Sequence, residues 1–172
     1  MGHCRSMTVP PLLKWSGDTA EWENYLDRVY SLFLSLFVHA NHLFLGKPVK
    51  ARWAPSHDNK HFSFWHVISE RGETKSEEDR LPNLQRCERI AWLGYVLENA
   101  ADRSHVWCWR NTRRGTHGVA KNYLLYLHQE RYLIVLAEKD DCFLLVTAYP
   151  VESNHTHTKL QREKNSSPDP RT

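Results

Sequence analysis

The sequence has little of several features that define particular protein classes. Glycine and proline number only 7 and 8 in 172 residues, which excludes collagen-like and low-complexity architectures. The longest apolar run, residues 32–38, is interrupted by Ser35 and ends at His39, so it is too short to span a bilayer. The first five residues lack the apolar stretch of a signal peptide. We therefore expect a cytoplasmic protein without a membrane partner.

Sites for metals and cofactors are also poorly represented. Four cysteines are present, but none forms a C-x-x-C pair, which argues against a zinc knuckle. In a cytoplasmic setting we expect these thiols to be reduced and packed as small hydrophobes. His39 and His42 have a spacing compatible with metal binding, but no carboxylate lies nearby. Neither a metal nor another cofactor is expected.

What the chain does contain is enough apolar material for a core. Hydrophobic residues make up 41% of the sequence and charged residues 25%, as in a folded domain of ordinary size. We expect one domain over residues 18–152, preceded by a weakly structured leader over residues 1–17. Residues 153–172 are expected to be a flexible polar tail, because their composition cannot bury much apolar surface.

Hydrophobic spacing in the first half predicts a helix followed by strands. Apolar residues recur at helical spacing behind a capping residue, Asp18, and predict a long amphipathic helix over residues 19–40. Two apolar runs, residues 43–53 and 62–69, are separated by turn-forming residues and predict a pair of strands. Residues 70–82 are charged and are expected to form a loop.

The second half predicts a sheet. Residues 86–92 mix strand and helix signals and are expected to be a strand or turn, followed by a short helix over residues 93–101. A strand at 106–109 then precedes a turn at 111–118 and three more strands, at 120–128, 131–138 and 142–149. The expected fold is α+β: a long N-terminal helix packed on a twisted antiparallel sheet with a C-terminal four-stranded meander.

Charge is distributed unevenly along the chain. Asp and Glu are absent from residues 103–129, although the formal net charge of the whole chain is only +3. Such a strip can present a positive surface to phosphate. It can equally be a solvated strand or loop whose charges keep the domain soluble.

Three segments combine titratable, cationic and hydroxyl side chains. His66 lies in an aromatic run expected to be a strand, where it is either a proton-transfer group or a core histidine bonded to a carbonyl. Arg86 and Arg89 flank a glutamate, which favours either oxyanion binding or a structural ion pair. Thr147 and Tyr149 project to one face of the last expected strand, and a buried tyrosine there commonly packs with its hydroxyl bonded.

Together these groups are typical of a metal-independent ribonuclease. In such an enzyme a base removes the proton of the RNA 2′-OH, the resulting oxygen attacks the adjacent phosphorus, and an acid protonates the leaving 5′-oxygen. We expect His66 to act as base or acid and Arg86 or Arg89 to bind the phosphate, one of them oriented by Glu88. The acid-free strip fits the RNA backbone, and its expected RNA-binding side chains are Arg110, Arg113, Arg114, Lys121 and Trp109.

The same segments carry a resemblance to a known family. Residues 61–69 (HFSFWHVIS), residues 79–92 (DRLPNLQRCERIAW) and residues 132–151 (YLIVL through FLLVTAYPV) resemble a bacterial and phage family of small proteins associated with the barnase–EndoU–colicin–RelE (BECR) ribonuclease fold. The resemblance covers about residues 44–152. It implies a helix packed on an antiparallel sheet, RNA cleavage without metal, and a toxin neutralised by a cognate antitoxin or immunity protein.

The resemblance also implies where the site lies. In that fold the active site is on the concave face of the sheet, and Lys139 stands where the pattern leads us to expect an arginine. The matching catalytic positions in this chain are His66, Arg86, Arg89, Thr147 and Tyr149.

Two other classes of function remain open from the sequence. One is a non-catalytic RNA- or DNA-binding module that uses the same basic strip, whose binding would weaken steeply with salt. The other is a protein-interaction domain whose partner surface is formed by some of the seven tryptophans.

Overall fold

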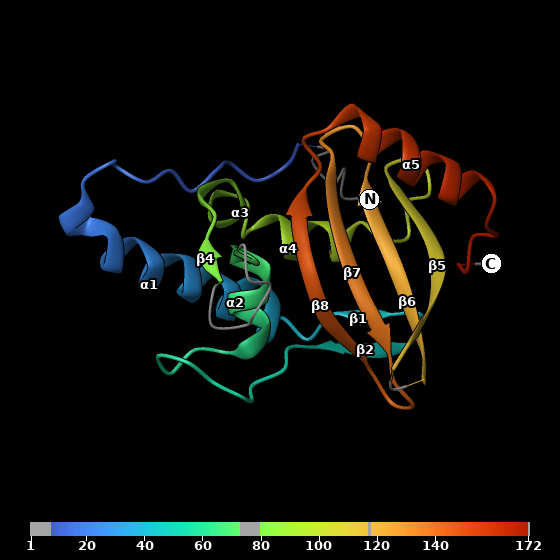
Figure 1. The fold of residues 1–172 in the computed structure, drawn as a ribbon, viewed down its shortest axis with the longest axis horizontal. Helices are drawn as coiled ribbons and strands as arrows, with labels where there is room; N and C mark the ends of the chain where they lie inside the picture. Colours follow the sequence, from blue (N-terminus) through green and yellow to red (C-terminus); the bar gives the residue numbers. More distant parts are fainter. Residues whose placement is uncertain (1–7, 73–79, 117, 172) are drawn as a thin grey trace, which may run out of the picture.

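The structure is a computed structural model that describes residues 8–72, 80–116 and 118–171, without the side chains of residues 113 and 115. Within these residues the fold is α+β, with a curled, mixed six-stranded sheet that carries helices on both faces (Figure 1). The α+β class predicted from the sequence is confirmed. No helix in the described ranges is long and apolar enough to cross a membrane.

The long N-terminal helix is confirmed. The side chain of Asp18 accepts a hydrogen bond from the N–H of Ala20 at 2.9 Å and caps the first turn. A 3-10 turn, Thr19–Glu21, leads into α1, Trp22–Phe33, which continues as a π-helical turn, Leu34–Val38. The helical segment thus ends close to the boundary expected at residue 40.

Three short helices follow α1. They are α2, α3 and α4, with the bounds Phe62–Ile68, Leu84–Glu88 and Trp92–Glu98. The strand expected over residues 62–69 is therefore wrong. Phe64, Val67 and Ile68 are fully buried, and their i, i+3, i+4 spacing places them on one face of a helix.

The strand or turn expected over residues 86–92 is wrong as well. The side chain of Asn83 accepts a hydrogen bond from the N–H of Arg86 at 3.1 Å and starts α3. The short helix expected over residues 93–101 is present as α4 with slightly different limits.

The sheet is mixed, not antiparallel throughout. Its strand order is β1-β2-β8-β7-β6-β5, and β2 runs parallel to β8 while the other neighbours are antiparallel. A parallel pair needs a long crossover, which here contains all three short helices. The bounds are β1 Leu43–Phe44, β2 Lys47–Lys50, β5 Val106–Gly115, β6 Gly118–Leu127, β7 Tyr132–Glu138 and β8 Phe143–Pro150, and a separate two-stranded sheet pairs β3 Ser69–Glu70 with β4 Leu81–Pro82.

The segments expected to be turn and loop differ in extent. The turn expected at residues 111–118 is mostly strand, because β5 and β6 pair up to Gly115 and Gly118. The residues here are polar and lie on a ribbon that extends beyond the core, so no apolar pattern marks them as strand. The loop expected over residues 70–82 contains β3 and β4 at its ends, and residues 73–79 lie outside the described ranges.

One edge of β8 is covered by a helix. β2 pairs with β8 only at Phe143 and Leu144, and above this point α2 lies along the strand. The hydroxyl of Ser63 donates to the carbonyl oxygen of Leu145 at 3.3 Å, and that of Thr147 donates to the carbonyl oxygen of His66 at 3.1 Å. These bonds satisfy polar groups along a strand edge that has no neighbouring strand.

A bulge in β8 decides which residues face which side. The register with β7 shifts between Val135, which pairs with Thr147, and Leu136, which pairs with Leu145. The extra residue is Val146. As a result Leu145 and Ala148 both face the core, and Thr147 and Tyr149 share the opposite face of the sheet.

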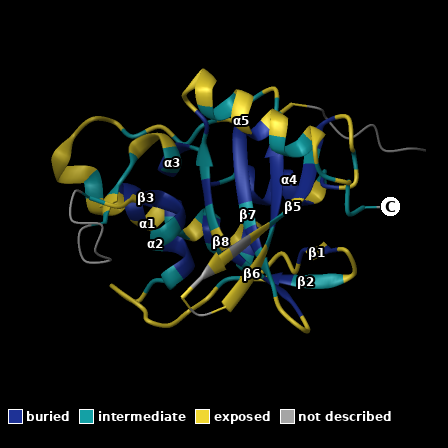
Figure 2. Cartoon of the chain, turned by 45° about the vertical axis from the view of Figure 1, so that its right-hand side comes forward, coloured by how far each residue is buried: buried dark blue, intermediate teal, exposed yellow. Residues whose placement is uncertain are grey.

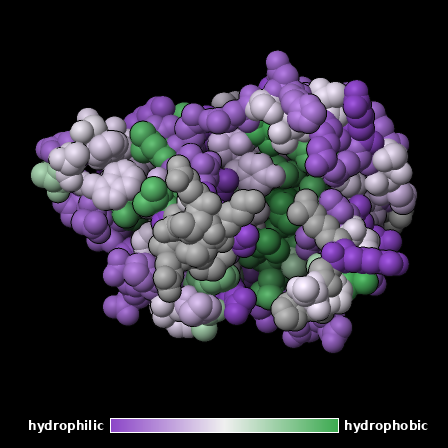
Figure 3. Space-filling view, in the orientation of Figure 1, coloured by the Kyte–Doolittle hydropathy of each residue, from purple (hydrophilic) through white to green (hydrophobic). Residues whose placement is uncertain are grey.

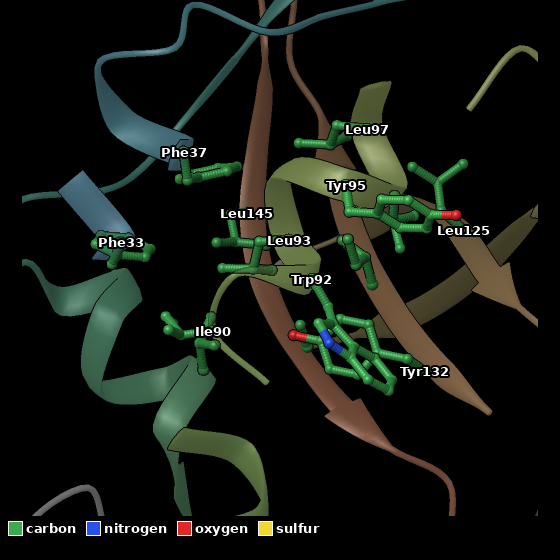
Figure 4. Close-up of a cluster of buried hydrophobic side chains, with 14 of the residues drawn as sticks. Phe33, Phe37, Ile90, Trp92, Leu93, Tyr95, Leu97, Leu125, Tyr132 and Leu145 are labelled. Carbon is green, nitrogen blue, oxygen red and sulfur yellow. The ribbon is translucent and has the colours of Figure 1, made fainter. Parts of the chain in front are cut away.

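The sheet separates two hydrophobic clusters (Figure 2). The larger one lies between the sheet and the helices, and Leu93 of α4 belongs to it together with Phe33, Phe37 and Leu145 (Figure 4). The close backbone approaches to this face are made by α2, α3 and α4, whereas α1 packs beside α3. The long helical segment contributes Phe33 and Phe37 to this cluster, and its closest backbone neighbours among the other helices are α3 and α4.

The smaller cluster lies under a helix that the sequence did not predict. Residues 154–165 form α5, Asn154–Asn165, which crosses the front of the sheet (Figure 1). Ser153 caps it, and its buried Leu160 packs with Trp109 and Tyr126. The expectation of a flexible tail over residues 153–172 is wrong for this part, because polar contacts such as that of Tyr126 with His157 dock the helix together with Leu160 and the Ser153 cap.

Candidate functional site

The five residues expected to be catalytic come from three neighbouring elements. His66 lies on α2, Arg86 lies on α3 with Arg89 just after it, and Thr147 and Tyr149 lie on β8. Both α2 and α3 pack against β8. We call the region where these three elements meet the α2–β8 junction.

The guanidinium of Arg86 is in contact with three neighbouring groups. Its Cζ lies 5.1 Å from the centre of the Tyr149 ring, within the range of a cation–π contact. Its Nη1 donates to the carbonyl oxygen of Ser69 at 3.0 Å, and its Nε lies 3.5 Å from Oε1 of Glu70. The amide of Asn83 also donates to that carboxylate oxygen, at 3.1 Å. The planar cation is thereby fixed in orientation before any ligand binds.

The electrostatic surroundings of Arg86 are mixed. Burial lowers the pKa of Arg86, and the carboxylate of Glu70 and the hydroxyls of Tyr149 and Tyr132 oppose this, while nearby Arg80 adds to it. Burial also raises the pKa of Tyr132, and the guanidinium groups of Arg86 and Arg89 oppose that rise. Arginine keeps its proton under such shifts, so a buried positive charge persists at the junction.

A second guanidinium lies beside the first. Nη1 of Arg80 donates to the same carbonyl oxygen of Ser69 as Arg86, at 3.3 Å. Two cations that share one acceptor form a concentrated positive centre, of the kind that binds phosphate oxygens. Arg80 was not among the residues expected at the site, although it lies in the DRLP segment that carries the family resemblance. The only signal for it was that position.

The side chain of His66 faces a hollow of its own. Its ring centre lies 4.1 Å from that of Phe62, and it lines a pocket of about 400 Å³. We call this the α2 pocket; it is lined by Pro55, Ser56, His57, Phe62, Trp65, His66 and Arg80. The carbonyl of His66, not its ring, meets Thr147. Because residues 62–68 form a helix and not the expected strand, His66 and Tyr149 line different hollows.

Thr147 and Tyr149 line a second hollow on the front of the sheet. It has a volume of about 220 Å³ and lies below α5. Leu124, Leu133, Val135 and Val146 form its apolar floor, visible as the green strip over β7 and β8 in Figure 3. Asn111 and Asn122 are on its far side. We call this hollow the front groove.

Arg89 and Glu88 form a structural ion pair. Nη1 of Arg89 lies 3.9 Å from Oε2 of Glu88 and donates to the carbonyl oxygen of Gln85 at 2.9 Å. Its guanidinium lies over the ring of Trp92 at 5.3 Å. Glu88 also pairs with Lys14 at 3.3 Å. Glu88 therefore contacts Arg89 and not Arg86. The carboxylate beside Arg86 is that of Glu70.

The residues expected to bind RNA are divided between two faces. Arg110, Arg114 and Lys121 share one face of the β5–β6 ribbon, the face that also carries the core residues Cys108 and Tyr123. Arg113 pairs with Ala120 on the opposite face, and its side chain lies outside the described part. Trp109 is only 1% exposed beneath α5, and its indole N–H donates to Glu163 at 3.4 Å. The expectation that Trp109 stacks on a base is therefore wrong.

Other chemistry is poorly represented in the described residues. No group of three or more His, Cys, Asp or Glu side chains among them is arranged to hold a metal ion. Comparisons of the chain with protein-family models, with curated proteins and with solved structures found no match.

Proposed function

We propose that the protein is a metal-independent endoribonuclease whose active site is the α2–β8 junction. The observation that carries the proposal is the pair of guanidinium groups, Arg80 and Arg86, on the carbonyl oxygen of Ser69. They lie between the α2 pocket, which contains His66, and the front groove, which contains Tyr149. An imidazole that can exchange a proton and two fixed cations are groups that can catalyse phosphodiester transfer to a 2′-oxygen.

Each residue then has a defined role. Arg86, and Arg80 beside it, bind the scissile phosphate and stabilise the charge that develops on its oxygens. His66 exchanges the proton of the 2′-OH or of the leaving 5′-oxygen. Tyr149 holds the guanidinium of Arg86 against its ring, and Thr147 holds α2 against β8 through the carbonyl of His66. Arg89 supports the fold of α3 and does not contact substrate.

The proposed biological setting follows from the resemblance in the sequence. We assign the chain to the BECR type of fold, in which helices precede an antiparallel meander, here β5 to β8. The proposed role is that of a cytoplasmic toxin that cleaves RNA until a cognate antitoxin or immunity protein binds it. The face of the β5–β6 ribbon that carries Arg110, Arg114 and Lys121 supplies additional contacts to the RNA backbone.

The test is a cleavage assay on single-stranded RNA in excess EDTA. We expect cleavage that leaves a 2′,3′-cyclic phosphate, because the 2′-OH is the nucleophile, and no cleavage of DNA, which lacks it. Expression of the wild-type chain is expected to arrest growth, and the His66→Ala chain is expected to be tolerated. Cleavage of single-stranded DNA, or loss of RNA cleavage in EDTA with recovery in Mg²⁺, would show that the mechanism is wrong.

A second candidate, a non-catalytic RNA-binding module, is favoured by one observation. Arg110, Arg114 and Lys121 share a ribbon face that is separate from the junction. If binding alone is the function, RNA affinity falls steeply with salt and is unaffected by His66→Ala. No cleavage product appears in that case.

A further inference from the structure

The helix that carries His66 has an unusual outer face. Its core side is formed by Phe64, Val67 and Ile68, which are fully buried. The other side of a surface helix is normally polar. Here it carries Phe62, Trp65 and His66, all only partly buried, which line the α2 pocket. Aromatic rings left partly in water beside a hollow indicate a ligand.

The rings of the α2 pocket are held in fixed positions. The indole N–H of Trp65 donates to the carbonyl oxygen of His57 at 2.9 Å, and the two rings meet edge to face at 5.3 Å. Phe62 packs on His66 and lies under the guanidinium of Arg52 at 4.8 Å. A wall that is already ordered loses little conformational entropy when a flat ligand binds to it.

The polar groups of the α2 pocket are concentrated on one side. Arg80 lines the pocket and reaches the carbonyl oxygen of Ser69, where Arg86 also donates. One part of a ligand in this pocket therefore contacts aromatic rings, and another part contacts the guanidinium pair of Arg80 and Arg86. A nucleotide has this division, with a flat apolar base joined to an anionic phosphate.

From these observations we infer that the α2 pocket is a nucleobase subsite, which takes one unstacked RNA base next to the phosphate bound by Arg80 and Arg86. Its volume of about 400 Å³ lies within the range of about 300–1,000 Å³ for small-molecule sites. The inference rests on the proposed function and adds the form of the substrate. A base can enter only after it leaves its helix, so the RNA must be single-stranded or looped at this position.

The experiment measures binding without cleavage. The full chain is titrated with a short, labelled 2′-O-methyl oligoribonucleotide, which lacks the nucleophile, and with a series in which one nucleotide at a time is abasic. Trp65→Leu removes a pocket ring. Trp53→Leu is the matched control, because Trp53 is 47% exposed and packs on His61 outside the pocket. Circular dichroism checks that both variants fold.

We expect Trp65→Leu to weaken binding about 5- to 150-fold, the loss typical of one stacked base, and Trp53→Leu to leave it unchanged within twofold. One abasic position is expected to weaken binding to wild type and to have no further effect on Trp65→Leu. Phe62→Leu is expected to reproduce this result if Trp65→Leu fails to fold. Duplex RNA of the same sequence is expected to compete poorly.

The inference is overturned if the two tryptophan variants bind alike, or if every abasic position weakens binding equally. It is also overturned if the pocket variants bind RNA normally but no longer bind a purified protein partner, since the pocket would then be a protein contact. Its failure is distinct from failure of the proposed function. An enzyme that cleaves RNA with Phe62→Leu and Trp65→Leu unimpaired has no such subsite. A chain that binds the oligonucleotide through these rings but never cleaves RNA has the subsite and lacks the activity.

Discussion

The guanidinium of Arg86 lies over the ring of Tyr149, with its Cζ 5.1 Å from the ring centre. The two residues come from α3 and β8, so this contact joins the helical layer to the sheet. The Arg86 side chain is 15% exposed. It is therefore shielded from water over most of its surface, and only a small part of it remains accessible.

Replacing Arg86 by lysine is expected to lower the rate of RNA cleavage almost as much as replacing it by alanine. Lysine keeps the charge but loses the planar fork that contacts Ser69, Glu70 and Tyr149. A loss of about 10²–10³ in kcat is typical when one donor to a developing oxyanion is removed. Arg28→Lys is the matched control, because Arg28 lies over Tyr25 at 5.8 Å on α1. If Arg86→Lys cleaves RNA as fast as Arg28→Lys does, the role of Arg86 is only structural.

His66→Ala is expected to lower kcat by about 10²–10⁴, as for loss of a general acid or base. His66→Gln tests the role separately, since glutamine retains a hydrogen-bonding side chain but cannot exchange a proton at neutral pH. His155→Ala, on the exposed side of α5, is the control and is expected to be fully active. Thermal unfolding checks that the variants fold. A folded, fully active His66→Ala chain contradicts the assignment, and loss of folding supports a packing role.

Docking of α5 is expected to depend on Leu160. This side chain is 6% exposed in the smaller cluster, and Leu160→Ala is expected to lower the free energy of unfolding by about 2–3 kcal/mol. Leu81→Ala, at a residue that is 71% exposed, is expected to change it by less than about 0.5 kcal/mol. Denaturant titration followed by circular dichroism measures both. Equal stability of the two variants would mean that α5 does not dock as described.

The two most buried thiols are expected to resist modification. Burial raises the pKa of Cys87 and of Cys108 from 9.0 to about 12, so little reactive thiolate forms at neutral pH. The folded state holds these protons more tightly than the unfolded state. Their contribution to stability is therefore complete below pH 9 and is lost as the pH rises toward 12.

Mass spectrometry of a chain with Cys4→Ser and Cys142→Ser, treated with a thiol reagent, measures this protection. We expect labelling of both remaining cysteines in guanidinium chloride and almost none in buffer at neutral pH. In the same chain, the free energy of unfolding is expected to fall between pH 9 and pH 12. Rapid labelling of the folded protein would contradict the described burial.

The fold could be predicted from the sequence where a segment carried a single clear pattern of hydrophobic residues. The long N-terminal helix follows from its cap and its apolar spacing, and the C-terminal strands follow from β-branched and aromatic runs. The error at residues 62–69 has a physical cause. Phe64, Val67 and Ile68 have helical spacing, but Phe62 and Trp65 on the other face concealed it and raised the apparent strand preference. Tertiary packing on β8 then decided in favour of α2.

The candidate site was predictable in its residue types and less so in its arrangement. The sequence placed Thr147 and Tyr149 on one face, which the bulge at Val146 preserves. It did not reveal that Arg80 shares the carbonyl oxygen of Ser69 with Arg86, because that contact joins separate segments of the chain. Trp109 was assigned to a surface because nothing in the sequence predicted that α5 would cover it.

The covering of β8 by α2 has a consequence for solubility. Beyond Leu144, β8 has no neighbouring strand at its outer edge. The hydroxyl of Ser63 and the carbonyl of His66, both on α2, make hydrogen bonds to β8 along that edge. A chain in which α2 detaches exposes an unpaired strand beside Val146, which is a template for intermolecular β-pairing and aggregation. Substitutions that loosen this helix are therefore expected to give inclusion bodies as well as inactive protein. The contacts that hold α2 on β8 therefore also protect this strand edge against aggregation.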